Sequence, residues 1–355
     1  GGRQAGTMAV GSGNGRGVTL DEVARVAGVS RATVSRVVNG NPKVGVDVKR
    51  QVERAIARLG YVPNPAARSL VTRRSDSVGV VIPEPPGMLF GDPFFPRLLR
   101  GISTELSARN LQLVLLMPQS SDEEARLERY LTAGHVDGAL LVSLHGDDTL
   151  PDALAARGVP VVVGGRPPTG DSVSYVDVDN VGGARTAVAH LIDGGRQTIG
   201  TISGPTDMTV GVDRLTGYHQ ALEAAGRTPD PALAAAGDFT QEGGAAAMSR
   251  LLEARPDLDA VFAASDLMAA GAIGTLKAAG LRIPEDVAIV GFDDSSIAPT
   301  SEPPLTSVRQ PIEEMGREMV RLLLEQAARP GTVPRKVILA TKLVRRRSSE
   351  GVPNR

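Results

Sequence analysis

Apolar residues first recur at a regular spacing between residues 18 and 60. Four of them share one face of a predicted helix: Leu20, Val23, Ala24 and Ala27. Thr19, with Glu22 three residues later, is a capping-box sequence that starts this helix, and Gly28 allows a tight turn after it. Ser30 can then cap a second helix whose valines face inward. The pattern predicts two short helices joined by a turn, which is a helix-turn-helix.

A third helix is predicted next, because apolar residues again fall on one face and Gly60 is a suitable C-cap. The segment that follows, GYVPNPAARSLVTRRSD, has a different character. Asn64 is a favourable N-cap and Pro65 suits the first helical position, so a helix can begin here, with Ala67 and Leu70 on one face. Two turns are too few for a helix that is stable in water, so this segment is predicted to fold only when it is bound.

From residue 76 onward, apolar runs alternate with helical segments. SVGVVIP and LQLVLLMP read as parallel strands that are buried on both faces, and FPRLLRGISTELSARN between them reads as a helix. Regular alternation of this kind predicts open parallel sheets with right-handed crossovers. About 280 residues are too many for one such sheet, so we expect two similar lobes with a ligand cleft between them.

Charge separates these two regions. Residues 18–74 hold eleven Lys and Arg against four Asp and Glu, a net charge of +7, whereas residues 75–355 carry −10. A basic head on an acidic body predicts a polyanion partner for the head, although a solvated charged surface would look the same. The chain has no cysteine, which excludes disulfides, thiol catalysis and cysteine-bound zinc and fits a cytoplasmic protein.

The second helix carries side chains suited to DNA. Arginine can form two parallel hydrogen bonds with a guanine, and a small residue such as Ala32 can contact a thymine methyl group. Hydroxyl and amide side chains, and the amides at helix N-termini, suit phosphate oxygens. We expect phosphate contacts from these residues: Thr19, Ser30, Thr33, Ser35 and Asn39. The alternative reading of the pattern by itself is a generic three-helix packing unit.

The sequence TLDEVARVAGVSRATVSRVVNG, followed by GYVPNPAARSL, resembles the DNA-binding head of the lactose repressor (LacI/GalR) family of bacterial transcription regulators. The resemblance implies that Arg31, Ala32 and Arg36 read bases. It also implies a short hinge helix that forms on DNA. From its place beside the small Ala67, Leu70 is expected to act as an apolar wedge in the minor groove, and the alternative is that Leu70 simply packs on the body. The residues assigned to this hinge are Asn64, Ala67, Arg68 and Leu70.

The same resemblance extends over the body, because the core of this family is similar to periplasmic sugar-binding proteins. It implies three crossings of the chain between the lobes. The expected divisions are a disordered tail at 1–17, a helix-turn-helix domain at 18–62, a hinge and linker at 63–75, a body at 76–348 and a tail at 349–355. Lobe 1 would take about 76–178 and 309–338, and lobe 2 about 179–308 and 339–348.

Candidate ligand contacts stand at predicted strand ends and loops. The residues chosen are Phe94, Phe95, Arg214, Phe239, Ser265, Asp266 and Asp293. Arginine and aspartate can hydrogen-bond sugar hydroxyls, and an aromatic ring can cover the apolar face of a sugar. Arg214, Asp293 and Phe239 fall where the resemblance implies those roles. Two alternatives remain open: Asp266 can be a helix cap, and one phenylalanine of the pair can belong to the core.

Other classes of function fit less well. The four histidines are scattered without metal spacing, and the glycine-rich stretches lack the lysine of a phosphate loop, so we expect no enzyme, metal or cofactor. A stand-alone solute receptor would not need the basic head, and a structural DNA binder would not need a cleft. The expected protein is a transcription regulator of the repressor type. It is expected to bind a palindromic operator as a homodimer and to respond to a sugar-like molecule, without a membrane partner. Inducer and corepressor both remain open.

Overall fold

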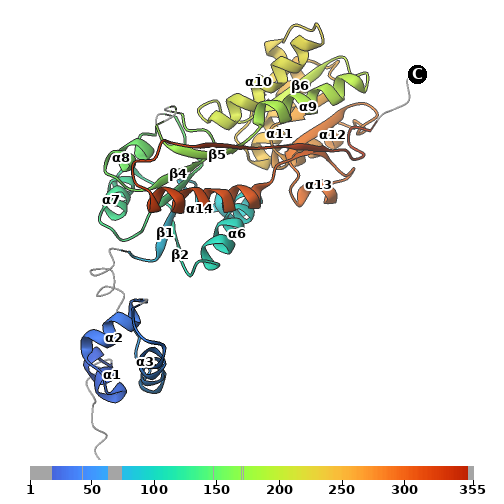
Figure 1. Ribbon diagram of the computed structural model, residues 1–355. Helices are drawn as coiled ribbons and strands as arrows, with labels where there is room; N and C mark the ends of the chain where they lie inside the picture. The colour runs from blue at the N-terminus through green and yellow to red at the C-terminus, as the bar shows by residue number, and fades with distance from the viewer. Residues whose placement is uncertain are drawn as a thin grey trace, which may run out of the picture. The chain divides into compact units, whose positions relative to one another are not determined.

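The computed structural model describes residues 18–41, 43–62, 74–146, 148–168, 170 and 172–350, and the chain divides into two units after residue 75 (Figure 1). We call residues 18–62 the head and residues 76–350 the body. The predicted hinge residues Asn64, Ala67, Arg68 and Leu70 lie outside the described residues. None of the described helices has the length and apolar composition needed to span a membrane.

The head consists of α1 (Leu20–Ala27), α2 (Arg31–Val38) and α3 (Val46–Leu59). The predicted capping box starts α1: the Thr19 amide donates to Glu22 Oε2 at 2.7 Å, and the Glu22 amide donates to Thr19 Oγ1 at 3.4 Å. Gly28 makes the turn to α2 with a φ of 61°, a conformation that glycine adopts at little cost. Val23, Val34 and other apolar side chains from all three helices fill one small core. The predicted helix-turn-helix is therefore confirmed.

The first lobe of the body is a six-stranded parallel sheet in the order β11-β5-β4-β3-β1-β2. Its strands are β1 (Ser77–Val81), β2 (Gln112–Leu116), β3 (Ala139–Val142), β4 (Val161–Gly164), β5 (Ser174–Val178) and β11 (Lys336–Leu339). Its helices are α5 (Pro86–Gly91), α6 (Phe94–Ser107), α7 (Ser121–Thr132), α8 (Leu150–Ala156) and α14 (Ile312–Ala328). Gly101 lets α6 approach α14 closely, because a Cβ there would lie 2.1 Å from the carbonyl oxygen of Glu313.

The second lobe is a six-stranded sheet in the order β12-β10-β9-β8-β6-β7, in which β12 is antiparallel to β10. Its strands are β6 (Ile199–Ser203), β7 (Ala234–Ala236), β8 (Ala260–Ala263), β9 (Ala288–Asp293), β10 (Thr306–Arg309) and β12 (Lys342–Val344). Its helical segments are α9 (Asn180–Asp193), α10 (Thr209–Ala224), η1 (Pro231–Leu233), α11 (Gln241–Ala254), α12 (Asp266–Ala278) and α13 (Ile297–Thr300). The predicted two-lobed α/β body is confirmed.

The chain passes between the lobes three times: after β5, after β10 and after β11 (Figure 1). Lobe 2 also continues beyond the expected end at residue 348. Ser349 is 7% exposed, and its Oγ lies 2.6 Å from Thr306 Oγ1 and 2.8 Å from a ring nitrogen of His190. The predicted tail therefore begins too early, because these hydrogen bonds anchor its first residue to the lobe.

Candidate DNA-reading surface and ligand cleft

One face of α2 is free of packing within the head. Arg31, Ala32 and Arg36 are exposed on this helix, while Val34 and Val37 are buried on its other side. Arg31 lies 3.6 Å from Asp21 of α1, with both side chains open to solvent. Three of the side chains expected to read bases are thus available at one surface, and α2 has the length and exposure that the major groove requires.

The side chains expected to contact phosphates already have partners within the head. Ser30 Oγ accepts a hydrogen bond from the Thr33 amide at 3.2 Å and lies 2.9 Å from the Thr33 hydroxyl. Asn39 Nδ2 donates to Ser35 Oγ at 3.3 Å. Thr19 and Ser30 thus cap the N-termini of α1 and α2, and Asn39 closes the C-terminal end of α2. Their oxygen atoms can meet a phosphate as well.

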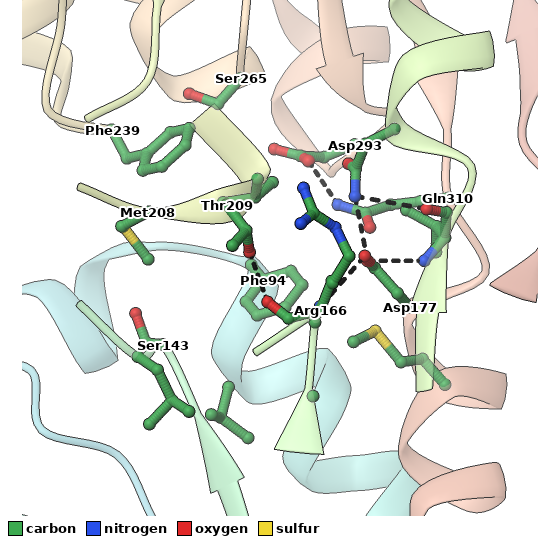
Figure 2. Close-up of a pocket in the computed structure, with 18 of the residues that line it drawn as sticks. Phe94, Ser143, Arg166, Asp177, Met208, Thr209, Phe239, Ser265, Asp293 and Gln310 are labelled. Atoms are coloured by element: carbon green, nitrogen blue, oxygen red, sulfur yellow. Dashed lines mark hydrogen bonds between the residues drawn. The ribbon is translucent and has the colours of Figure 1, made fainter. Parts of the chain in front are cut away.

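The body contains a cavity of about 100 Å³ between its two lobes. Residues from strand ends and loops of both lobes line it (Figure 2). The predicted residues among them are Phe94, Phe95, Arg214, Phe239, Ser265 and Asp293. Their gathering follows from topology, because the carboxyl ends of parallel strands meet at one edge of a sheet.

Arg214 is held firmly although it is only 4% exposed. Its Nε donates to Asn180 Oδ1 at 2.9 Å, and its Nη1 donates to the carbonyl oxygen of Ala264 at 2.6 Å. Nη1 also lies 3.5 Å from Asp293 Oδ1, and the guanidinium stands 3.7 Å from the centre of the Phe292 ring. A buried cation with this many fixed partners is positioned before any ligand arrives.

Asp293 ends β9 with a φ of 111°, and Asp294 follows at 48°. Positive φ angles are unfavourable for residues other than glycine, so these two consecutive residues carry backbone strain. Such strain concentrates at functional sites. Gln310, in the crossover after β10, donates from Nε2 to Asp293 Oδ1 at 2.6 Å. Burial raises the pKa of Asp293 well above its ordinary value, and the nearby Arg214 opposes this increase.

The phenylalanines contribute unequally to the cavity. Phe94 and Phe95 meet edge to face, with ring centres 5.3 Å apart. Phe95 is 3% exposed and belongs mainly to the core of lobe 1, whereas Phe94 is half-buried. Phe239 has a φ of 63° and packs against Gly204, where a Cβ would lie 2.3 Å from its ring. All three rings line the cavity, and Phe94 is the most exposed of them.

Ser265 and Asp266 separate into two roles. Ser265 is the N-cap of α12, accepting from the Met268 amide at 3.2 Å, and it lines the cavity. Asp266 is fully buried and accepts from Ser307 Oγ at 2.5 Å and from the Ser295 amide at 2.7 Å. It is absent from the described residues that line the cavity. The prediction that Asp266 contacts a ligand is therefore corrected, because its carboxylate braces the loop after β9 instead.

Several lining residues were not predicted from the sequence: Asp92, Ser143, Arg166, Asp177, Asn180, Met208, Thr209 and Gln310. Ser143 and Asp177 stand at the ends of β3 and β5, so the strand-end reasoning that found Asp293 also applies to them. Gln310 lies in the crossover after β10, whereas Asp92 lies within lobe 1, between α5 and α6. No signal in the sequence indicated them.

The lobes also meet at the edge of the cavity. His145 of lobe 1 lies 2.9 Å from Asp207 of lobe 2 through Nδ1 and 3.0 Å from Glu84 through Nε2. These two carboxylates, above all Glu84, raise the pKa of His145 to about 9. Arg166 of lobe 1 donates to Asp213 of lobe 2 at 2.5 Å. The described conformation therefore has ionic contacts that hold the lobes together.

Comparison with known families assigns both units. Residues 19–64 match the family described as bacterial regulatory proteins, lacI family, and residues 188–349 match the periplasmic binding protein-like domain.

Full-length relatives agree with this division. The HTH-type transcriptional regulator CelR of Thermobifida fusca is 52% identical over 93% of this chain and 98% of its own length. A solved transcriptional regulator CelR–cellobiose complex superposes with a TM-score of 0.75 at 50% identity, over 93% of this chain and 99% of that one. A lac repressor dimer bound to operator and an anti-inducer superposes with a TM-score of 0.83 at 27% identity, over 94% of this chain and 99% of that one.

Proposed function

Because the chain belongs to the lacI family of bacterial regulatory proteins, and is thus a DNA-binding transcriptional regulator and not an enzyme, we propose that it represses genes from a palindromic operator under the control of a saccharide. The saccharide binds in the cavity between the two lobes. The single observation that carries this proposal is the buried pair of Arg214 and Asp293, fixed at the base of that cavity.

The chemistry of the cavity supports a saccharide. Arg214 and Asp293 offer polar atoms that are already oriented, and Phe94 and Phe239 offer apolar ring faces. Sugars combine hydroxyl groups with apolar ring faces, so they match this combination of groups. The similarity to a CelR protein that was solved with cellobiose supports a β-linked disaccharide as the first compound to test.

The head supports the DNA part of the proposal. Arg31, Ala32 and Arg36 read base edges in the major groove, while hydroxyl groups at the helix starts contact phosphates. We further propose that residues 64–70, which lie outside the described residues, form a helix on DNA and that Leu70 enters the minor groove between the two half-sites. One head reads few base pairs, so a homodimer on a palindromic site is needed for specificity. The similarity to a repressor dimer solved on its operator is in line with this arrangement.

The saccharide acts on DNA binding through the lobes. Lobe 1 begins at β1, directly after the hinge residues in the sequence, so a shift of lobe 1 between the two subunits changes the distance between the two hinges. The hinge helices pair only at a suitable distance. A saccharide that binds one arrangement of the lobes more tightly than the other therefore changes the affinity of the protein for its operator. The size of this change is limited by the difference between the saccharide's affinities for the two arrangements.

Selection from random duplex DNA tests the DNA part of the proposal. The full-length protein should enrich a sequence with two-fold symmetry, and sedimentation should show two chains on each duplex. A monomer that binds an asymmetric site with the same specificity would contradict it.

A thermal-shift screen of saccharides tests the ligand part. A compound present at a hundred times its Kd should stabilise the body by about 2.7 kcal/mol. A screen in which cellobiose and other saccharides leave the unfolding temperature unchanged would contradict saccharide control.

A further inference from the structure

The hydrogen-bond donors that line the cavity are largely engaged by the protein itself. Arg214 donates from Nε to Asn180 and from Nη1 to Ala264. Arg166 lines the cavity, but its Nη2 donates at 2.5 Å to Asp213, which does not line it. A ligand that accepts hydrogen bonds from these atoms would therefore have to compete with bonds that already exist.

The neutral donors in the cavity are engaged in the same way (Figure 2). Gln310 Nε2 donates to Asp293, and the Thr209 hydroxyl donates to the carbonyl oxygen of Arg166 at 2.6 Å. The Ser143 hydroxyl donates to Glu84 Oε1 at 2.5 Å. These three bonds occupy hydrogens that a phosphate or carboxylate could otherwise accept.

Acceptors, in contrast, remain available. Asp92 Oδ1 accepts from the Phe94 amide at 2.8 Å, and its second carboxylate oxygen forms no hydrogen bond with the described residues. Among the described residues, Gln310 and Arg214 both contact Asp293 through Oδ1, which leaves its Oδ2 for a ligand. A carboxylate oxygen can accept more than one hydrogen bond, so the cavity fits a ligand whose hydroxyl groups donate.

The balance of charge points in the same direction. Asp92, Asp177 and Asp293 line the cavity with Arg214 and Arg166, and Arg166 is already paired with Asp213. Burial raises the pKa of all three carboxylates, because each loses part of the solvation of its charge. A bound anion would add to this excess of negative charge.

We propose that the cavity selects neutral saccharides and excludes phosphorylated or acidic ones, and that Asp92 is the residue that enforces this selection. The inference rests on the proposed function, since it specifies the saccharide. Asp177 accepts three hydrogen bonds within the protein, and Asp293 is paired with Arg214 and Gln310. Asp92 has one protein donor, so its charge is the least compensated and acts directly on a ligand.

Calorimetry on the full-length protein tests this selection with cellobiose and with cellobiose phosphorylated on a primary hydroxyl. For the unchanged protein, we expect the phosphorylated sugar to bind about a hundredfold more weakly, as like charges a few ångströms apart in a protein cavity require. In Asp92→Asn the ratio of the two affinities should shrink by about tenfold, because one charge is gone while an acceptor oxygen remains. Asp122→Asn, an exposed position on α7, is the matched control and should leave the ratio unchanged.

The outcomes separate the two proposals. Equal or tighter binding of the phosphorylated sugar would overturn the proposed selection and leave saccharide control intact. The first turn of α10 could bind such a phosphate, because Met208 offers no side-chain cap there. An unchanged ratio in Asp92→Asn would remove Asp92 from it, since a merely structural role lowers both affinities equally. If neither sugar binds, the proposed function fails and this inference fails with it.

Discussion

Arginines carry the specificity proposed for both regions of the molecule, but their surroundings are opposite. In the head, Arg31 and Arg36 extend into solvent from α2, whereas Arg214 in the body is surrounded by protein on all sides. The contacts that shape the head join residues three or four positions apart, such as Thr19 with Glu22. Arg214 instead joins partners that are 34 and 50 positions away. The head thus needs only its own three helices to present its reading surface, while the cavity exists only when both lobes have folded.

This difference determines how each region should respond to change. An exposed arginine that meets DNA acts through partners outside the protein, so its loss should alter binding and leave stability nearly intact. A buried arginine also balances buried carboxylates, so its loss should alter both.

Arg214→Ala should give the largest effect. It leaves Asp293 and Asn180 without their partner, so the body should lose about 3–5 kcal/mol of unfolding free energy, and cellobiose binding should disappear. Urea unfolding and calorimetry measure the two quantities. Arg185→Ala, on an exposed position of α9, serves as the control. A stable variant that still binds cellobiose normally would show that Arg214 has neither role.

Arg36→Ala should weaken binding to the selected operator by about 1–3 kcal/mol and relax the preference at one base pair. Unfolding of the body and cellobiose affinity should stay unchanged, since Arg36 is exposed in the other unit. Fluorescence anisotropy with operator and with random duplex gives the comparison, and Arg54→Ala on α3 is a matched exposed control. Equal losses on both duplexes would make Arg36 a phosphate contact.

Thr19→Ala should remove the capping box and cost the head about 1 kcal/mol of stability. The effect should appear as earlier melting of α1 by circular dichroism, with the melting of the body unchanged. Thr19→Ser keeps the hydroxyl and should restore most of the loss. A head that melts at the same temperature in all three proteins would show that the cap contributes nothing.

The smallest effect is expected from pH. The pKa of His145 is raised from 6.5 to about 9, so its contribution to the joined lobes is fully present below about 6.5 and is lost as pH rises through about 9. Its side chain is 41% exposed, and solvent screening limits the effect to a few-fold change in cellobiose affinity. In His145→Gln the same titration should be flat. A change that persists in the variant would belong to another group.

The sequence alone was sufficient to predict features that depend on residues close together along the chain. Thr19 with Glu22, the Gly28 turn and the alternation of strands and helices follow from local chemistry, and the structure contains each of them. The resemblance to a family added Arg214, Asp293 and Phe239, and all three line the cavity. Asp266 was misassigned because its partner Ser307 lies on β10, and the register of that strand against β9 cannot be read from either segment. Asp92 was missed although it lies two residues before Phe94 and accepts a hydrogen bond from the Phe94 amide.

Reciprocal binding measurements test most directly the central claim that the cavity controls the head. The Kd of the full-length protein for its selected operator is measured with and without saturating cellobiose, and the Kd for cellobiose is measured with and without operator. Linkage requires both constants to change by the same factor, and we expect about fivefold or more, with the direction distinguishing inducer from corepressor. Two constants that each stay unchanged while both partners bind would show that the two sites are independent and would contradict the account.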